Sequence, residues 1–408
     1  MTDELYVVIG AGAAGIAAAR TLHDAGRRAV VIEARAQVGG RAWSIDVPGY
    51  DARLDLGCGW LHSAARNPWV DIARARGFTI DTSTARWGEQ WRDLGFPPRE
   101  QKASGAAWAR FAAAARAVLP GPDRALADAV RDPRWRPHID AISGYANGAP
   151  LARVSLHDWS AYEDHAGPDN WAVREGFGTL IADHAAGLDV RLGTPVTRID
   201  HRDLRLAIET ASGTIAADRA IVTVQTPALA QERIAFDPPL PDKVAAAGDL
   251  PLGLADKVFL HAPRGDWPDN AHLIGSPYRS ATISYRLSPF GLPVIEGFYG
   301  GDFAERMDEA AATAFAIEEL VALLGSDWRR RFTPLRASRW RAAAYIRGSY
   351  SQARIGASAQ RQALAAPVDD RLFFAGEACS RNDFSTAHGA YATGVAAARA
   401  LLAAAGSA

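Results

Sequence analysis

Short apolar runs alternate with glycine-rich and alanine-rich stretches along the first forty residues. A run at 5–9 that contains β-branched side chains leads into a glycine-rich turn, and an alanine-rich stretch then continues to about Leu22. A second apolar run covers 29–32. This order predicts a strand, a helix and a second strand, which together form a βαβ unit.

The turn after the first strand carries glycines at spacings that suit a bound dinucleotide. Gly10 permits a tight turn, Gly12 lets a pyrophosphate approach the backbone, and Gly15 lets the helix pack closely on the strand. The amino end of the helix, which includes Ala14, would hold the phosphates. Glu33 stands 18 residues after the last glycine, where its carboxylate can accept both hydroxyls of an adenosine ribose. The pattern predicts a Rossmann-like unit whose nucleotide has no 2′-phosphate.

A second glycine-rich loop follows this acid and contains Arg35, Gly39, Gly40 and Arg41. The glycine pair permits close approach to the other side of the same pyrophosphate, and Arg41 supplies a positive charge there. A fold that binds only a nicotinamide nucleotide does not need this loop. We therefore expect Arg35, Gly40 and Arg41 to contact the cofactor.

The rest of the chain changes character more than once. Residues 76–170 combine proline-containing loops, an alanine-rich helix around 103–118 and many tryptophans, and short strands return after Gly176. The apolar pattern predicts strands at 190–192, 196–199, 204–208, 221–224, 252–261, 281–286, 293–299 and 372–375, and helices around 178–186, 304–324 and 387–403.

These elements predict an α/β fold, α+β overall, in which a Rossmann-like cofactor domain is assembled from three segments. A second domain, inserted between them, is expected to bind the substrate and to combine a mixed sheet with flanking helices. The cofactor domain is expected at 1–75, 171–240 and 340–408, and the substrate domain at 76–170 and 241–339.

Composition and charge narrow the classes of function. The 408 residues are 48% hydrophobic and 22% charged, which is ordinary for a globular protein. The net charge of −1 gives no long-range field to attract nucleic acid or an anionic membrane, and no apolar stretch is long enough to span one. The acidic start lacks a secretory signal, and Cys58 and Cys379 cannot build a disulfide framework, so a cytoplasmic protein is expected. The histidines and cysteines lack metal-binding spacings, so no metal is expected.

Several stretches resemble the flavin-containing amine oxidase family of monoamine oxidases, polyamine oxidases and lysine-specific histone demethylases. The resemblance covers nearly the whole chain and implies bound FAD, oxidation of a carbon–nitrogen bond, and reoxidation of the flavin by oxygen. The stretches that carry it are the glycine motif with Glu33 and 39–41, the segment 54–62, Lys257, the segment 347–351, and 374–378 with 385–391.

Details within these stretches resemble the polyamine oxidase branch more than the monoamine oxidases. Residues 60–62, Trp-Leu-His, match a segment whose histidine faces the substrate channel in that branch. Monoamine oxidases have a flavin-linked cysteine where this chain has Ser349, so the resemblance implies non-covalent FAD. Monoamine oxidases also use two tyrosines as an aromatic cage. Here Tyr350 fits the first position and Thr386 occupies the second.

The resemblance assigns roles to residues at the reacting end of the site. Lys257 would hold a water against flavin N5, and His62 would face the substrate channel. Tyr350 and Thr386 would take the two cage positions and complete the candidate catalytic set. A cationic substrate would also need acids, for which the candidates are Glu163, Asp164, Asp169 and Glu296.

The resemblance also assigns cofactor contacts outside the glycine motif. Val196 would meet the adenine through its backbone. The positive end of the last helix, at Ala387, would face the flavin pyrimidine. The remaining expected contacts are Gly57, Gly59, Trp60, Trp340, Gly376 and Glu377.

The resulting prediction is an FAD-dependent amine oxidase that acts on a polyamine or a related secondary amine. Hydride passes from the α-carbon of the neutral amine to flavin N5, the iminium hydrolyses to an aldehyde and an amine, and O2 is reduced to H2O2. No strong base is needed, because a dry aromatic pocket lowers the pKa of the amine by desolvation. The expected partners are the small-molecule amine and O2, not nucleic acid or a membrane, and the protein is expected to be a monomer or homodimer.

Two alternatives stay open on the sequence. One is an oxidase of a primary monoamine or an L-amino acid, and the latter needs an arginine that clamps the substrate carboxylate. The other belongs to a different class: a flavin-loaded protein that binds a partner without turnover.

Overall fold

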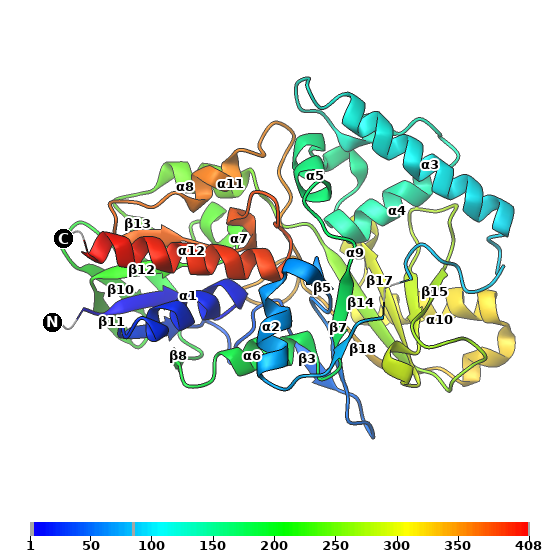
Figure 1. The fold of residues 1–408 in the computed structure, drawn as a ribbon, viewed down its shortest axis with the longest axis horizontal. Coiled ribbons are helices and arrows are strands. Elements are labelled where there is room, and N and C mark those ends of the chain that lie inside the picture. The colour runs from blue at the N-terminus through cyan, green and yellow to red at the C-terminus, as the bar shows by residue number, and fades with distance from the viewer. Residues whose placement is uncertain (1–3, 84–85, 407–408) are drawn as a thin grey trace.

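The computed structural model describes residues 4–83 and 86–406 of the chain. Figure 1 shows an elongated molecule with two halves. Strand β1 (Tyr6–Ile9) and the end of helix α12 (Ala387–Gly406) lie in the half that contains a parallel sheet. The other half holds an antiparallel sheet and a group of helices.

The first half is built on a parallel sheet with β1 at its centre. Val7, Val8 and Ile9 are buried apolar residues, which suit a strand that is covered on both faces. All of the pairings in this sheet are parallel. The strand order is β19 (Leu372–Phe374), β12 (Arg219–Val222), β1, β2 (Ala29–Ile32) and β8 (Asp189–Arg191).

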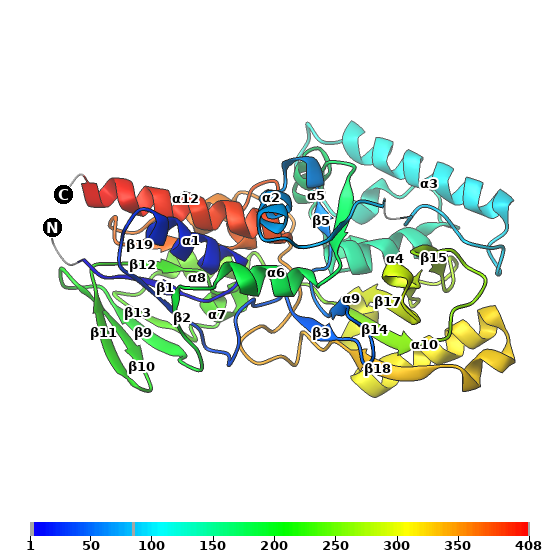
Figure 2. The same cartoon turned by 60° about the horizontal axis from the view of Figure 1, so that its bottom comes forward.

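Helix α1 (Ala13–Asp24) and helix α12 cover one face of this sheet and pack on each other. The approach is close because small residues face the contact: a Cβ at Gly394 would overlap the backbone of Ala14. A four-stranded sheet and short helices cover the opposite face, as Figure 2 shows. They are β9 (Val196–Asp200), β10 (Leu206–Thr210), β11 (Gly213–Ala217), β13 (Ala235–Asp237), α7 (Thr226–Ala230), α8 (Pro241–Gly248) and α11 (Gln360–Ala365).

The second half is built on an antiparallel sheet with helix α10 (Glu309–Leu324) against one face. Side chains alternate across this sheet, so Val258 and Leu260 belong to the core beside α10, whereas Lys257 lines a cavity. The strand order is β15 (Ala271–Ile274), β16 (Ser284–Leu287), β17 (Val294–Gly300), β14 (Ala255–His261) and β18 (Thr333–Ala337), and the short helix α9 (Gly301–Glu305) follows β17.

Three helices form a separate core in the second half, around Phe111, Trp135 and Trp159. They are α3 (Pro98–Ala117), α4 (Arg136–Asn147) and α5 (Leu156–Glu163), which we call the helical group. Smaller elements lie between the two halves in Figure 1. They are α2 (Pro68–Ala75), α6 (Phe177–His184), β3 (Ser44–Asp46), β5 (Leu61–His62) and β7 (Asn170–Val173). Strand β4 (Arg53–Asp55) pairs with β3, and β6 (Ile80–Asp81) pairs with β7.

The predicted fold class, with a Rossmann-like sheet and a second domain, is confirmed. The sheet of the second half was expected to be mixed, but its described pairings are all antiparallel. Short connections join β15, β16 and β17, and only antiparallel neighbours can be joined so briefly. Strands β15 and β18 were not predicted.

Two predicted boundaries differ from the structure. The expected helix at 304–324 is two helices, because the side chain of Asp308 caps a new start by accepting the N–H of Ala311. The expected start of the substrate domain at 241 coincides with α8. Ala246 and Ala247 of α8 belong to the core beside the parallel sheet, so this helix stays with the first half.

Candidate active site

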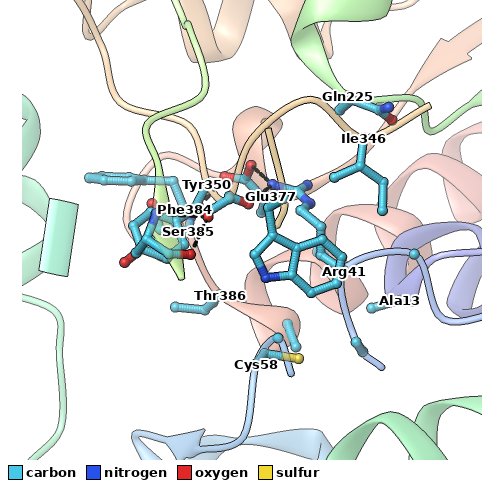
Figure 3. Close-up of a pocket in the computed structure, with 18 of the residues that line it drawn as sticks. Ala13, Arg41, Cys58, Gln225, Ile346, Tyr350, Glu377, Phe384, Ser385 and Thr386 are labelled. Carbon is cyan, nitrogen blue, oxygen red and sulfur yellow. Dashed lines mark hydrogen bonds and ion pairs between the residues drawn. The ribbon is translucent and has the colours of Figure 1, made fainter. Parts of the chain in front are cut away.

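A cavity of about 1010 Å³ extends from the carboxyl ends of β1 and β2 to the helical group. It brings together every residue predicted for catalysis or cofactor binding except Gly15. Figure 3 shows Arg41, Glu377, Tyr350 and Thr386 around it. The other predicted residues that line it are Gly10, Gly12, Ala14, Glu33, Arg35, Gly40, Gly57, Gly59, Trp60, His62, Val196, Lys257, Trp340, Gly376 and Ala387.

The glycine turn has the open backbone that a pyrophosphate needs. Gly10 has a φ of +105°, and a Cβ there would lie 2.6 Å from the hydroxyl oxygen of Thr223. Gly12 and Gly39 form a β-bridge that brings the two glycine loops together. Gly15 does not line the cavity. A Cβ at this position would overlap the carbonyl oxygen of Gly10. Its role is close packing, and the cleared backbone fits a dinucleotide.

Glu33 is fixed at the end of β2 by backbone donors. Its buried carboxylate accepts the N–H of Ala11 at 2.7 Å and the N–H of Arg35 at 2.8 Å. The guanidinium of Arg35 donates to the carbonyl of Gly40 at 2.6 Å, which ties the two predicted loops together. Both side chains therefore stabilise the shape of the nucleotide end of the cavity.

A buried carboxylate connects three segments in the middle of the cavity. Glu377 is 4% exposed and accepts hydrogen bonds from Arg41 (2.8 Å), from the N–H and hydroxyl of Ser351 (3.1 and 2.6 Å), and from the N–H of Ser385 (2.8 Å). Figure 3 marks the bond to Arg41. Burial raises the pKa of Glu377, but the nearby Arg41 charge and the bond from Ser351 outweigh burial, so its pKa lies below its ordinary value.

Helix α12 begins at the wall of the cavity. The hydroxyl of Thr386 donates to the carbonyl of Asp383 at 2.6 Å and accepts the N–H of Gly389 at 2.9 Å, so it caps the helix. This hydroxyl is thus committed to the helix start. The first N–H groups of a helix have no partner within it, so the end at Ala387 presents positive partial charge to the cavity.

Lys257 lies buried in the wall of the cavity. Its ammonium donates to the backbone carbonyl of Asp55 at 2.9 Å and pairs with the carboxylate of Glu296 at 2.8 Å. Gly59 makes room for this arrangement, because a Cβ there would lie 3.2 Å from the ammonium nitrogen. The lysine is therefore held in one place by two acceptors.

Two of the four candidate acids line the cavity and two do not. Glu296 lines the cavity but is paired with Lys257, and Glu163 lines it with a pKa that burial raises. Asp164 and Asp169 are not among the lining residues. Asp164 instead pairs with Arg116 at 3.3 Å on the exposed surface.

Aromatic side chains dominate the part of the cavity that reaches the helical group. Tyr350 donates its hydroxyl to the carbonyl of Tyr145 on α4, and burial raises the pKa of Tyr350. Phe384 and Tyr162 pack with ring centroids 5.6 Å apart, and Trp108 lines the cavity beyond them. Sequence reasoning missed Tyr145, Tyr162 and Phe384. Only Phe384 had a sequence signal, because it directly precedes the matched segment at 385–391.

His62 lies on β5 beside aromatic residues of the same wall. Its Nδ1 is 2.6 Å from the side-chain oxygen of Asn170, and its ring centroid lies 6.1 Å from that of Trp87. Burial lowers the pKa of His62 to about 4, so this ring is neutral near pH 7. Trp60 and Trp87 pack edge to face with centroids 5.0 Å apart. Trp340 donates its indole N–H to the carbonyl of Leu56 at 3.2 Å.

Comparison with known proteins agrees with this architecture. Residues 101–402 match the family described as "Flavin containing amine oxidoreductase", and residues 8–75 match an "NAD(P)-binding Rossmann-like domain". The chain is 30% identical to polyamine oxidase 2 of Arabidopsis thaliana, over 96% of this chain and 86% of that protein. The chain belongs to the flavin-containing amine oxidoreductase family. This amine oxidase uses FAD, as the resemblance implied.

This amine oxidase is also similar to a lysine-specific histone demethylase homologue and to a putrescine oxidase. It is 28% identical to lysine-specific histone demethylase 1 homolog 2 of Arabidopsis thaliana, over 97% of this chain but only 58% of that protein. A structure of wild-type putrescine oxidase bound to putrescine superposes with a TM-score of 0.77 at 19% identity, covering 98% of this chain and 99% of that one. At this identity the superposition shows a shared fold.

The described residues also bear on membranes and metals. Within 4–83 and 86–406, none of the helices has the length and apolar character that crossing a membrane requires. In the same ranges, no three His, Cys, Asp or Glu side chains are grouped so that they could hold a metal ion.

Proposed function

We propose that this FAD-dependent amine oxidase acts on a polyamine or a related secondary amine. Bound FAD supplies the two-electron oxidation of the carbon–nitrogen bond, after which water splits the oxidised amine into an aldehyde and a smaller amine. O2 takes up the electrons and leaves as H2O2. The observation that carries the proposal is the continuation of the cavity past Tyr350 into the helical group, which leaves room for a long substrate.

Residues of this chain supply binding and orientation for that chemistry. Gly12 and Gly40 clear the backbone for the pyrophosphate, Glu33 stands where a ribose binds, and Arg41 places a positive charge near them. No lining side chain has to act as a strong base. The aromatic wall excludes water, and desolvation lowers the pKa of an amine that enters, so the neutral form is favoured.

The FAD is proposed to be non-covalent. Ser349 stands at the position of the linking cysteine, and its hydroxyl donates to the carbonyl of Ala255 at 2.6 Å while accepting the N–H of the same residue at 2.9 Å. Cys58 also lines the cavity, but burial raises the pKa of its thiol to about 12. It is therefore protonated at neutral pH, and a thiol in that state is a poor nucleophile.

Charges along the cavity bear on the competing amino acid oxidase. Arg286 lines the cavity, and an arginine there is what a substrate carboxylate would need. Its Nε and Nη2 already donate to the side-chain oxygen of Asn270 at 2.9 and 2.6 Å, and Nη1 lies 3.7 Å from Glu296. Glu163 offers a carboxylate on the side of the helical group. This distribution favours a cationic substrate over an anionic one.

The test is anaerobic mixing of the oxidised protein with a panel of amines while the flavin absorbance is followed. Spermine, spermidine and their N-acetyl forms should bleach the flavin with a higher second-order rate constant of reduction than benzylamine. Each extra polar contact in a partly dry channel contributes about 1 kcal/mol, or roughly fivefold, so two contacts give a preference of tens-fold. Faster bleaching by benzylamine or an amino acid would replace the polyamine assignment with that alternative, and no bleaching by any amine would favour the non-catalytic reading.

The remaining expectations concern the compartment, the oligomeric state and the electron acceptor of the enzyme. We propose a cytoplasmic monomer or homodimer that uses O2 as its acceptor. Cys58 and Cys379 are both free thiols, which suits a reducing compartment. Peroxide detection during turnover in air tests the acceptor, and light scattering tests the oligomeric state.

A further inference from the structure

A buried row of charges runs across the antiparallel sheet beneath the active-site wall. Lys257 on β14 pairs with Glu296 on β17 at 2.8 Å, and Arg286 on β16 lies 3.7 Å from the other oxygen of the same carboxylate. Their side chains are 7%, 11% and 14% exposed, respectively. The guanidinium of Arg286 in turn lies over the ring of Trp60, 4.6 Å from its centroid. All of these residues line the cavity.

The register of the sheet produces this row. Arg286 stands directly opposite Glu296 in the pairing of β16 with β17. Lys257 stands opposite Phe298 in the pairing of β14 with β17, so Glu296 is its diagonal neighbour on the same face. The three charged side chains therefore meet on one face across three adjacent strands.

Another carboxyl group, that of Asp55, lies close to Lys257 but has other hydrogen-bond partners. The side chain of Asp55 accepts the hydroxyl of Ser44 at 2.5 Å and the N–H groups of Phe177 and Gly178 at 2.9 and 3.1 Å. Lys257 contacts only the backbone carbonyl of Asp55. Glu296 is thus the carboxylate that pairs with the lysine.

Glu296 is held in its charged form by its neighbours. Burial raises its pKa, but the positive charges of Lys257 and Arg286 outweigh burial, so the pKa of Glu296 lies below its ordinary value. A buried carboxylate with a cation on each side has a fixed position. The ammonium has three N–H groups, and Asp55 and Glu296 engage two of them, which leaves one for a ligand in the cavity.

We propose that Glu296 is a positioning residue that fixes the ammonium of Lys257 in the active-site wall and offsets its charge there, with Arg286 anchoring Glu296 from behind. This inference rests on the proposed function and on the role that the family resemblance implies for Lys257, which is to hold a water against flavin N5 and assist reoxidation by O2. Without Glu296, Lys257 and Arg286 lose the carboxylate that lies between them. Asp55 is then the other acid whose charge acts on both cations, and it contacts the ammonium only through its backbone carbonyl, so the flexible lysine side chain is less confined.

The lysine content of the chain permits a direct test that needs no amine substrate. Only Lys102, Lys243 and Lys257 are present, so FAD-loaded protein labelled with ¹³C at the lysine ε-carbon gives three NMR signals. Lys257→Met assigns the third. Glu296→Gln should shift or broaden this signal and leave the other two in place, with FAD still bound. An unchanged Lys257 signal overturns the proposal.

A matched control is available on the other side of the same sheet. Glu319 is also a buried carboxylate, and it accepts bonds from Thr282 at 2.9 Å and Tyr285 at 3.0 Å, away from the lysine. Glu319→Gln should destabilise the protein without moving the Lys257 signal. If Glu296→Gln does not fold, Glu296→Asp keeps the charge but shortens its reach, and it should still shift or broaden the Lys257 signal and leave the other two in place. Equal movement in the Glu319→Gln control overturns the proposal.

Kinetics supply a second readout. Glu296→Gln should slow reoxidation of the reduced flavin by O2 about tenfold or more, the factor for one lost hydrogen bond between charged groups, and slow anaerobic reduction less. Lys257→Met should do the same, and the double variant should be no slower than Lys257→Met alone, because the carboxylate acts through the lysine. Additive losses overturn the proposal. If no amine reduces the flavin, dithionite reduction still permits this measurement, so failure of the proposed function remains distinguishable.

Discussion

Replacement of Glu377 by glutamine tests whether a buried carboxylate holds the centre of the cofactor cavity together. The change keeps the size and shape of the side chain but removes its charge and replaces one acceptor oxygen with an N–H donor. In the structure, one oxygen accepts Arg41 and the N–H of Ser351, and the other accepts the hydroxyl of Ser351 and the N–H of Ser385. A glutamine has only one acceptor oxygen, so it can keep the hydrogen bonds that reach one of the two carboxylate oxygens but not both sets.

The magnitude follows from the better of the two glutamine orientations. With its oxygen toward Arg41, the amide nitrogen faces the N–H of Ser385, and a buried donor left without an acceptor costs about 1–3 kcal/mol. The bond from Arg41 also changes from charged to neutral, which costs about 1 kcal/mol more. We therefore expect Glu377→Gln to lower the free energy of unfolding of the FAD-loaded protein by about 2–4 kcal/mol.

Urea unfolding at pH 7, followed by the fluorescence of released FAD, measures this difference. Asp46→Asn is a suitable control, because Asp46 and Arg53 form an exposed pair at 2.8 Å that should contribute less than about 1 kcal/mol. If Glu377→Gln and Asp46→Asn give the same stability, the carboxylate does not hold the three segments together and the reasoning is wrong.

The pH dependence of the same difference gives an independent check. The pKa of Glu377 is lower in the folded protein than the value of about 4.3 expected for the unfolded chain. Its contribution is therefore fully present above about pH 4.3 and is lost as the pH falls through the folded value, because the unfolded chain takes up the proton first. Glutamine does not titrate, so wild type and Glu377→Gln should differ by a constant amount from pH 6 to 8 and converge in acid.

Three further predictions follow from other contacts. Acid precipitation should release intact FAD into solution, because Ser349 cannot form a thioether; flavin that stays with the precipitate would contradict this. His62→Ala should reduce the preference for polyamines over benzylamine while FAD stays bound. His62→Gln should leave the pH profile of kcat/KM between pH 6 and 8 unchanged, since the pKa of His62 is about 4 and the ring is already neutral there. Gly15→Ala should lower the free energy of unfolding by about 1–3 kcal/mol, because the added Cβ would overlap the carbonyl of Gly10. Unchanged thermal unfolding would show that the helix can move away from this contact.

Features that depend on residues close together in the chain could be predicted from the sequence. The glycines of the first turn, the apolar strands on each side and Glu33 at the end of β2 identify a dinucleotide-binding unit, because backbone conformation and close approach depend on residues near one another in the chain. The structure places Gly10 and Gly12 at the cavity and Gly15 in the helix contact, as those demands require.

Resemblance to a family added the residues that local patterns could not identify. Nothing in the apolar run at 252–261 indicates that Lys257 faces a cavity, and Thr386 is an ordinary helix cap by its sequence. The structure brings both to the same cavity, together with Tyr350. Their chemical roles stay predictions, which the kinetic experiments above address.

The contacts between residues far apart in the chain could not be predicted from the sequence. Glu296 was a candidate for binding a cationic substrate, yet it pairs with Lys257 and stands opposite Arg286. Tyr145 likewise accepts the hydroxyl of Tyr350 from a helix more than two hundred residues earlier in the chain. Cross-strand register and helix packing set these contacts, and a shift of one residue in register would turn each side chain to the other face of the sheet. A single sequence does not encode that register in any local pattern, so the partners of a buried charge become known only once the strands are paired.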